Sequence, residues 1–107
     1  MKQLHPAELA QWRADADRPA PLVLDVREPW EVAIAQLPDS VTMPMNQIPA
    51  RIDELPRDRA IVCLCHHGMR SMQVAHFLDH HGYPEVYNLS GGIDAWARVV
   101  DPSCATY

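Results

Sequence analysis

The sequence predicts a single α/β domain in which a largely parallel sheet is flanked by helices on both faces. Short apolar runs alternate with helix-forming segments along most of the 107 residues. The two strongest runs, residues 22–26 and 60–65, are apolar almost throughout, which is typical of strands covered on both faces. The connections between runs are too long for hairpins, so we expect mostly parallel strands.

Prolines mark the elements of the first half of the chain. Pro6 suits the first position of a helix, and Pro29 begins a second one after the strand at 22–26. A brief strand at 41–43 then ends at Pro44.

The second half is expected to contain two strands and three helices. In order they are a helix over 48–55, a strand over 60–65, a helix from near Ser71 to the stop signal Gly82, a strand over 85–89 and a helix over 93–100. No linker divides the chain, so we expect 1–107 to form one domain, with 101–107 as a C-terminal tail.

The composition narrows the class of protein. Hydrophobic residues make up 48% of the chain and charged residues 21%, as in soluble globular domains. The net charge is -5, and the single Lys and scattered Arg residues argue against nucleic-acid binding. No apolar run approaches the ~20 residues of a membrane span, and the first residues lack the apolar core of a secretory signal. We therefore expect a cytoplasmic protein with neither a nucleic-acid nor a membrane partner.

The cysteines indicate thiol chemistry. There are three, Cys63, Cys65 and Cys104, whereas secreted disulfide scaffolds usually carry an even and denser set. We therefore expect reduced thiols, and at least one of them calls for a chemical explanation.

Cys65 is the strongest candidate for a reactive residue. It ends the most apolar strand, just ahead of a helix whose first amides, together with Arg70, favour a negative charge on sulfur. Gly68 permits a tight turn with inward N–H groups, which can hold a thiolate, a persulfide or an oxyanion. The alternative is that Cys65 is a small apolar residue buried at a strand end.

The neighbouring ligand-type residues are weaker candidates. Cys63 shares a strand face with Cys65, but residues at one strand end do not readily converge on a tetrahedral ion, so we expect a core residue and no metal site. Cys104 is either a free surface thiol or a resolving thiol. His66 and His67 either face a substrate or are simply exposed.

Other residues are expected to support the site or the core. Asp25 and Arg27 end a strand at the same sheet edge, where they would brace the cysteine loop by hydrogen bonds or an ion pair. We expect the tryptophans Trp12, Trp30 and Trp96 to anchor the core or the helix packing.

Several motifs together resemble the single-domain rhodaneses. Residues 65–71, Cys-His-His-Gly-Met-Arg-Ser, match the family's active-site loop C-x-x-G-x-R and its following helix. The resemblance extends to Asp-Val-Arg-Glu at 25–28, to Pro-Ala-Glu-Leu at 6–9, and to Gly-Gly at 91–92 followed by Trp96. The motifs have the family's order and spacing, so the resemblance implies a single rhodanese-like domain.

The resemblance implies a sulfurtransferase that needs no cofactor. Cys65 would take a sulfane sulfur from a donor such as thiosulfate and pass it from a persulfide to cyanide in vitro, or to a thiol or protein in the cell. The residues implied to hold the terminal sulfur are His66, His67, Gly68, Met69 and Arg70, and Arg70 would add positive charge for an anionic donor. Met69 and Met72 offer an adaptable apolar rim for an acceptor protein, or act as gap filler.

Two rival functions remain open. One is a rhodanese-fold interaction or sulfur-relay module with low turnover. The other is a cysteine-dependent phosphatase or arsenate reductase, disfavoured because the related phosphatases use a longer C-x5-R loop, whereas Cys65 and Arg70 here form C-x4-R. One stretch departs from the family pattern, since Gln36–Ser40 replaces the usual His-Ile-Pro-Gly-Ala turn. There we expect an altered turn and a changed partner surface rather than lost activity.

Overall fold

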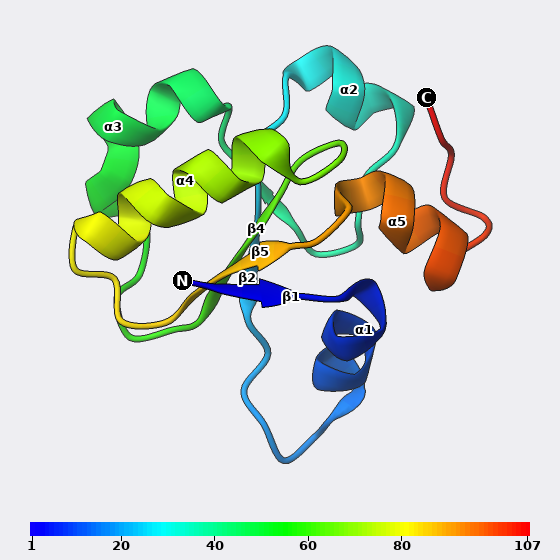
Figure 1. Ribbon diagram of the computed structural model, residues 1–107, viewed down its shortest axis with the longest axis horizontal. Helices are drawn as coiled ribbons and strands as arrows, with labels where there is room; N and C mark the ends of the chain where they lie inside the picture. Colours follow the sequence, from blue (N-terminus) through cyan, green and yellow to red (C-terminus); the bar gives the residue numbers. More distant parts are fainter.

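A computed structural model describes residues 1–107 and contains one sheet of five strands that all run in parallel (Figure 1). The strands are β1 (Lys2–Leu4), β2 (Leu22–Asp25), β3 (Val41–Thr42), β4 (Ile61–Leu64) and β5 (Val86–Leu89). Their order across the sheet is β1-β5-β4-β2-β3. The two strands that were expected to be apolar on both faces, β2 and β4, are central and fully buried.

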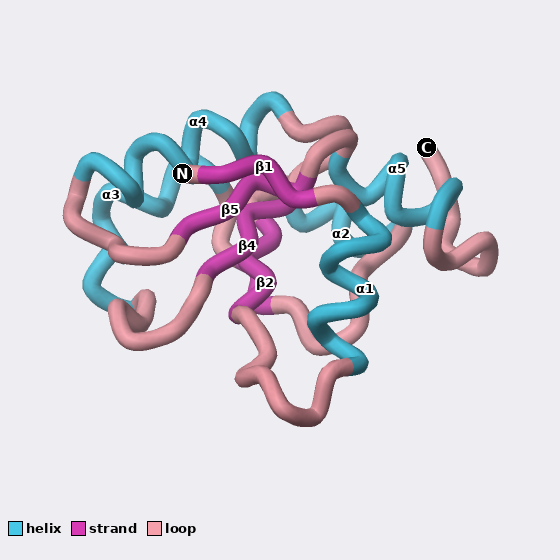
Figure 2. The backbone as a smooth tube through the Cα atoms, turned by 60° about the horizontal axis from the view of Figure 1, so that its bottom comes forward, coloured by secondary structure: helices cyan, strands magenta, loops and turns pink.

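Helices cover both faces of this sheet (Figures 1 and 2). They are α1 (Pro6–Ala14), α2 (Pro29–Ile34), α3 (Ile48–Arg51), α4 (Met69–His80) and α5 (Gly92–Val99). Short 3-10 turns at Met45–Gln47 and Ile52–Glu54 flank α3. The predicted α/β architecture with a parallel sheet between two helical layers is confirmed.

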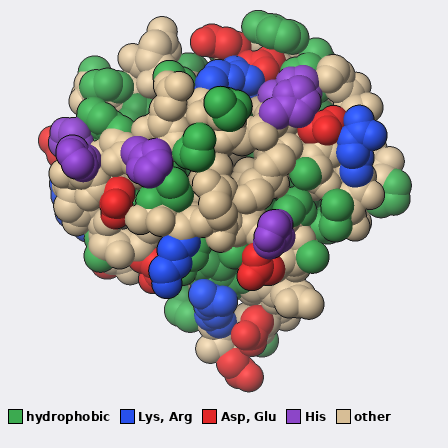
Figure 3. All heavy atoms as spheres, viewed as in Figure 1, with side chains coloured by type: hydrophobic (Ala, Val, Ile, Leu, Met, Phe, Trp, Pro, Cys, Tyr) green, Lys and Arg blue, Asp and Glu red, His purple; other side chains and the backbone are tan.

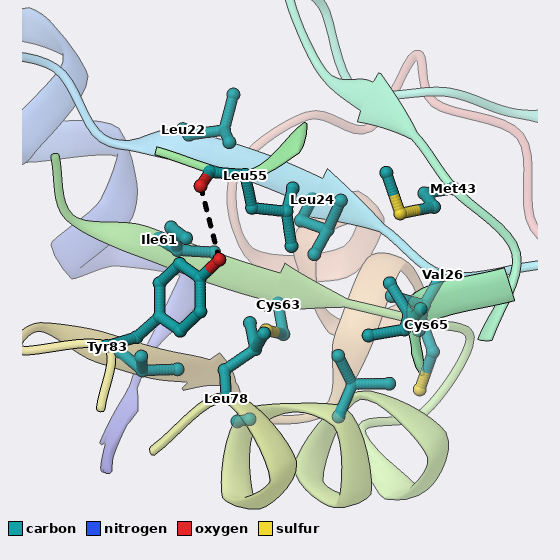
Figure 4. Close-up of a cluster of buried hydrophobic side chains, with 14 residues drawn as sticks. Leu22, Leu24, Val26, Met43, Leu55, Ile61, Cys63, Cys65, Leu78 and Tyr83 are labelled. Carbon is teal, nitrogen blue, oxygen red and sulfur yellow. Dashed lines mark hydrogen bonds between the residues drawn. The ribbon is translucent and has the colours of Figure 1, made fainter. Parts of the chain in front are cut away.

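The sheet separates two hydrophobic clusters because successive strand residues face opposite sides. On one side, alternate residues of β2 and β4 such as Leu24 and Cys63 pack against Leu78 of α4 (Figure 4). On the other side, Val23 and Val62 pack with residues of α1 and α5. Each fully buried aliphatic side chain contributes roughly 1.5–3 kcal/mol to stability, so these layers hold the sheet edge in place.

Strand β1 was not predicted from the sequence, and one predicted helix has a different form in the structure. Only Leu4 of the three β1 residues is buried, so no alternation marked this strand, and it forms because it pairs with β5 at the sheet edge. The expected helix over 48–55 is divided into α3 and the 3-10 turn at Ile52–Glu54. The helix expected near Ser71 begins two residues earlier, at Met69.

Trp30 corrects a further expectation. Trp12 and Trp96 are buried in the core as predicted, but Trp30 is 63% exposed at the start of α2. The indole of Trp30 contacts the ring of Tyr107 edge-on, with the ring centroids 6.1 Å apart. Glu31 is the one buried residue among the six of α2, so the start of this helix does not cover the core. No helix in the structure is both long and apolar enough to cross a bilayer.

Candidate active site

The cysteine loop lies at the carboxyl edge of the central strands, where parallel α/β sheets usually bind ligands. Cys65 directly follows β4, and α4 starts four residues later (Figure 1). Gly68 caps α4 with a positive φ of 102°, a conformation that favours glycine. This turn aims the Gly68 N–H at Cys65 Sγ, with the nitrogen 3.1 Å from the sulfur. The local sequence therefore builds the sulfur-facing turn that the spacing predicted.

A buried polar pair lies next to the sulfur, and no local pattern in the sequence predicts this pairing. The Ser71 hydroxyl is 3.3 Å from Cys65 Sγ and 2.5 Å from Oδ1 of Asn88. Nδ2 of Asn88 donates to the carbonyl of Gly68 at 3.1 Å and to Oε1 of Gln3 at 3.0 Å. The amide orientation is thus fixed, and the single Ser71 proton is offered either to Asn88 or to the sulfur. Cys65 itself is 1% exposed, so the sulfur is nearly free of bulk water.

The start of α5 holds the other side of the loop. The N–H of Ile93 donates to the Cys65 carbonyl at 2.9 Å, and that of Asp94 to the His66 carbonyl at 3.1 Å. Gly92 makes this contact possible, because a Cβ there would lie 2.4 Å from both carbonyl oxygens. Two helix N-termini, those of α4 and α5, therefore meet at the loop (Figure 1).

Arg70 is bound to a carboxylate that the sequence analysis did not single out. Its two terminal nitrogens donate to the two oxygens of Glu31 at 2.7 and 2.8 Å. Glu31 is 3% exposed, and it also caps its own helix by accepting the Glu28 N–H at 2.9 Å. The hydrogen bonds from Arg70 outweigh burial and lower the pKa of Glu31 to about 2, while Glu31 raises the pKa of Arg70. The charge expected to face an anionic donor is therefore already paired.

Tyr107 joins this ion pair from the end of the described chain. Its hydroxyl donates to Oε1 of Glu31 at 2.9 Å and accepts from Arg27 at 3.0 Å. Its ring stacks on His66, with centroids 3.8 Å apart and planes 6° from parallel. Burial raises the pKa of Tyr107, so the phenol stays protonated and can donate to the carboxylate. Residues 101–107 thus bring a side chain back to the site.

Asp25 and Arg27 form an ion pair with each other, at 2.7 Å, and both side chains are fully buried. Arg27 also donates to the carbonyls of Glu31 at 3.2 Å and Ala35 at 2.7 Å. The pair therefore braces α2 and the segment after it, and reaches the cysteine loop only through Tyr107 and Glu31. This explains why two charges tolerate full burial at this position.

His66, His67 and Asp94 lie close together, with one ligand atom of each within 4.8 Å of the others. The two imidazole rings are 3.8 Å apart between centroids and 32° from parallel. Asp94 is engaged by Arg98 at 3.0 Å. Burial, with a smaller effect of His67, lowers the pKa of His66, whose buried Nε2 has no hydrogen-bond partner.

The remaining candidates occupy separate places. Cys63 is buried in the core, and burial raises its pKa, which makes it an inert thiol. Cys104 is partly buried against the cluster that also contacts Tyr107. Met69 is 66% exposed at the start of α4, beside the loop.

The fold and this loop define an α/β domain with a cysteine on a glycine turn at the carboxyl edge of a parallel sheet. The chain belongs to the rhodanese-like domain family, whose sequence profile matches residues 5–99. A sulfurtransferase of Allochromatium vinosum is 46% identical over 83 residues, covering 78% of each chain. The candidate sulfurtransferase YtwF of Bacillus subtilis is 37% identical over 102 residues, covering 95% of this chain and 96% of its own.

Solved structures agree with this assignment. A rhodanese-related protein of Thermoplasma volcanium superposes with a TM-score of 0.86 at 27% identity, over 100% of both chains. A protein of Staphylococcus saprophyticus superposes with a TM-score of 0.84 at 28% identity, over 98% of this chain and 99% of its own.

Gly92→Ala should destabilise the protein by at least about 3 kcal/mol, because a left-handed residue with a Cβ costs ~1–2 kcal/mol and the added carbon also strikes two carbonyl oxygens. Gly82→Ala is the matched control, since Gly82 also has a positive φ but its added Cβ would meet only the end of the Arg57 side chain. Urea unfolding measures both. Equal losses for the two variants would contradict the proposed role of the α5–loop contact.

Asp25→Ala should cost about 3–5 kcal/mol, because it leaves the Arg27 charge buried without its partner. Arg51→Ala, which removes an exposed ion pair with Glu54, should leave the urea midpoint unchanged. If the two substitutions have similar effects, the buried pair does not support the fold as described.

Glu31 should contribute stability that is lost in acid. Its folded pKa of about 2 lies below its ordinary value of 4.5, so the contribution is complete above pH 4.5 and disappears as the pH falls towards 2. The free energy of unfolding should exceed that of Glu31→Gln by on the order of 2 kcal/mol at neutral pH, and the difference should narrow across this interval. Urea titrations at several pH values test this, and a constant difference would contradict it.

Proposed function

We propose that the protein is a sulfurtransferase that carries a sulfane sulfur as a persulfide of Cys65. The observation that carries this proposal is the position of Cys65 Sγ, beside the Gly68 N–H and the Ser71 hydroxyl at the start of α4. Membership of the rhodanese-like family and relatives named sulfurtransferases support it.

The first half-reaction loads the cysteine. The Cys65 thiolate attacks the outer sulfur of a donor such as thiosulfate. A bond forms between Sγ and that sulfur, the S–S bond of the donor breaks, and sulfite leaves with the bonding electron pair. Amides of the loop from His66 to Arg70 hold the terminal sulfur of the persulfide anion, because free N–H groups at a helix start favour negative charge.

The second half-reaction unloads it. A nucleophile attacks the outer sulfur, and the Cys65 thiolate leaves with the electron pair of the S–S bond. Cyanide as acceptor gives thiocyanate, while a thiol or an acceptor protein takes the sulfur as a new persulfide. Both halves are displacements at sulfur, so neither consumes an external oxidant or reductant. Burial of Cys65 keeps water away from the persulfide between the two steps.

The geometry around Arg70 argues against the phosphatase alternative. A phosphatase needs a loop wide enough for phosphate and an arginine free to bind it in a bidentate manner. Here the cysteine-to-arginine interval is C-x4-R. Both terminal nitrogens of Arg70 donate hydrogen bonds to the carboxylate of Glu31. A low-turnover interaction module remains the second candidate, favoured by the exposed Met69 and Trp30 near the site.

Intact-protein mass spectrometry after thiosulfate treatment tests the proposal. Wild type should gain one sulfur atom that cyanide removes as thiocyanate, and Cys65→Ser should gain none, because a hydroxyl does not ionise near neutral pH. Cys104→Ser, which removes the one cysteine that is not fully buried, should load like wild type. An adduct that survives in Cys65→Ser would contradict the assignment.

The same preparations separate the rival functions. A phosphatase would release phosphate from an aryl phosphate, whereas we expect no release. A module without turnover would load neither thiosulfate sulfur nor that of any other sulfane donor, yet would remain folded.

A further inference from the structure

The arginines at the loop edge of the sheet are all paired. Arg27 binds Asp25 at 2.7 Å, Arg70 binds Glu31 at 2.7 Å, and Arg98 binds Asp94 at 3.0 Å. None of the three guanidinium groups therefore offers an unbalanced positive charge to a molecule at the cysteine loop. On the face drawn in Figure 3, the Lys and Arg side chains do not gather into one large patch but lie among acidic and His side chains.

Among the three arginines, Arg70 is the one closest in sequence to the candidate nucleophile Cys65. Arg70 stands in the loop motif itself, and its hydrogen bonds to Glu31 raise its pKa. Glu31 is held from three sides, by Arg70, by the Tyr107 hydroxyl and by the Glu28 N–H. With a pKa of about 2, the Glu31 carboxyl is charged near neutral pH, so it balances the positive charge of Arg70 there.

The remaining source of positive charge at the cysteine loop is the backbone N–H groups at the starts of α4 and α5. The N-termini of α4 and α5 each carry a partial charge of roughly half a unit, and the α5 amides of Ile93 and Asp94 are already bound to loop carbonyls. A partial charge of this size balances one negative charge far better than two. Burial of His66 lowers its pKa and so removes a further source of positive charge beside the loop.

We infer that Glu31 determines donor specificity: by neutralising Arg70 it makes the site favour singly charged sulfane donors over doubly charged ones. The inference rests on the proposed sulfur transfer through Cys65 and names the class of donor. Thiosulfate is a dianion, whereas an alkyl thiosulfonate carries the same sulfane sulfur with a single negative charge.

The two donors react alike, which makes the comparison clean. In each, the Cys65 thiolate attacks the terminal sulfur, the S–S bond of the donor breaks, and its electron pair leaves on the oxidised sulfur. Thiosulfate releases sulfite, and methanethiosulfonate releases methanesulfinate. The loaded persulfide is the same, so any difference between donors arises before or during loading.

Glu31→Gln is the direct test because it keeps the shape of the side chain and frees the charge of Arg70. The kcat/KM for thiosulfate relative to methanethiosulfonate, with cyanide as acceptor, should rise about tenfold, mainly through the KM for thiosulfate. The rise should fade at high salt, since an unpaired charge is screened. An unchanged ratio in the folded variant overturns the inference.

Two further variants separate charge from packing. Tyr107→Phe removes a hydrogen bond from the same carboxylate without changing its charge, so the donor ratio should stay as in wild type even if stability falls. Arg70→Gln leaves Glu31 unbalanced and should shift the ratio about tenfold the other way, against thiosulfate. A shift in Tyr107→Phe as large as that in Glu31→Gln would assign the effect to loop packing and overturn the inference.

A measurement on wild type needs no variant to fold. Because Glu31 balances the charge of Arg70, the ratio of the kcat/KM values for thiosulfate and methanethiosulfonate should change less than about twofold between low and high ionic strength. A steep loss of thiosulfate activity with salt would reveal an unpaired cation and contradict the inference. Failure of the proposed function looks different, because then neither donor would place a sulfur on Cys65 in wild type.

Discussion

The contact between the start of α5 and the cysteine loop is the constraint on which the site depends. It ties the end of β4 to the helix after β5 through N–H bonds to the carbonyls of Cys65 and His66. With these carbonyls bound on one side, the turn at Gly68 directs its N–H toward the sulfur on the other. Gly92 is required because no side chain fits between the two backbones. The Gly68 N–H and the Ser71 hydroxyl are therefore already in place beside the sulfur.

A second layer of the structure balances charge rather than providing it. Carboxylates bind Arg27, Arg70 and Arg98, and Glu31 is shared by its own helix, by Arg70 and by Tyr107. Such networks fix side-chain positions more than they add stability, because burying charges offsets much of the attraction between them. The ion pairs hold the side chains near the sulfur in place, and the N-termini of α4 and α5 supply the partial positive charge. The proposed choice of donor depends on this difference between the side chains and the helix ends.

The sequence led to the parallel sheet, its two helical layers and the cysteine turn because these follow from local patterns. Apolar runs at β2 and β4 mark strands covered on both faces. Gly68, between a strand and a helix, marks a turn that needs a left-handed residue. The misjudged elements have the opposite character. The strand β1 is short and mostly exposed, and Trp30 lies on a helix too short to bury it, so neither carries a periodic signal.

The sequence by itself thus determined the architecture, the family and the place of Cys65 at the carboxyl edge of the sheet. Only the tertiary structure decided what surrounds the sulfur and its rim. Ser71 meets Asn88 from 17 residues away, Arg70 meets Glu31 across 39 residues, and Tyr107 meets Glu31 across 76. Pairings of this kind depend on how separate elements are placed in space, and a lone polar side chain leaves no periodic trace along the chain from which its partner can be read.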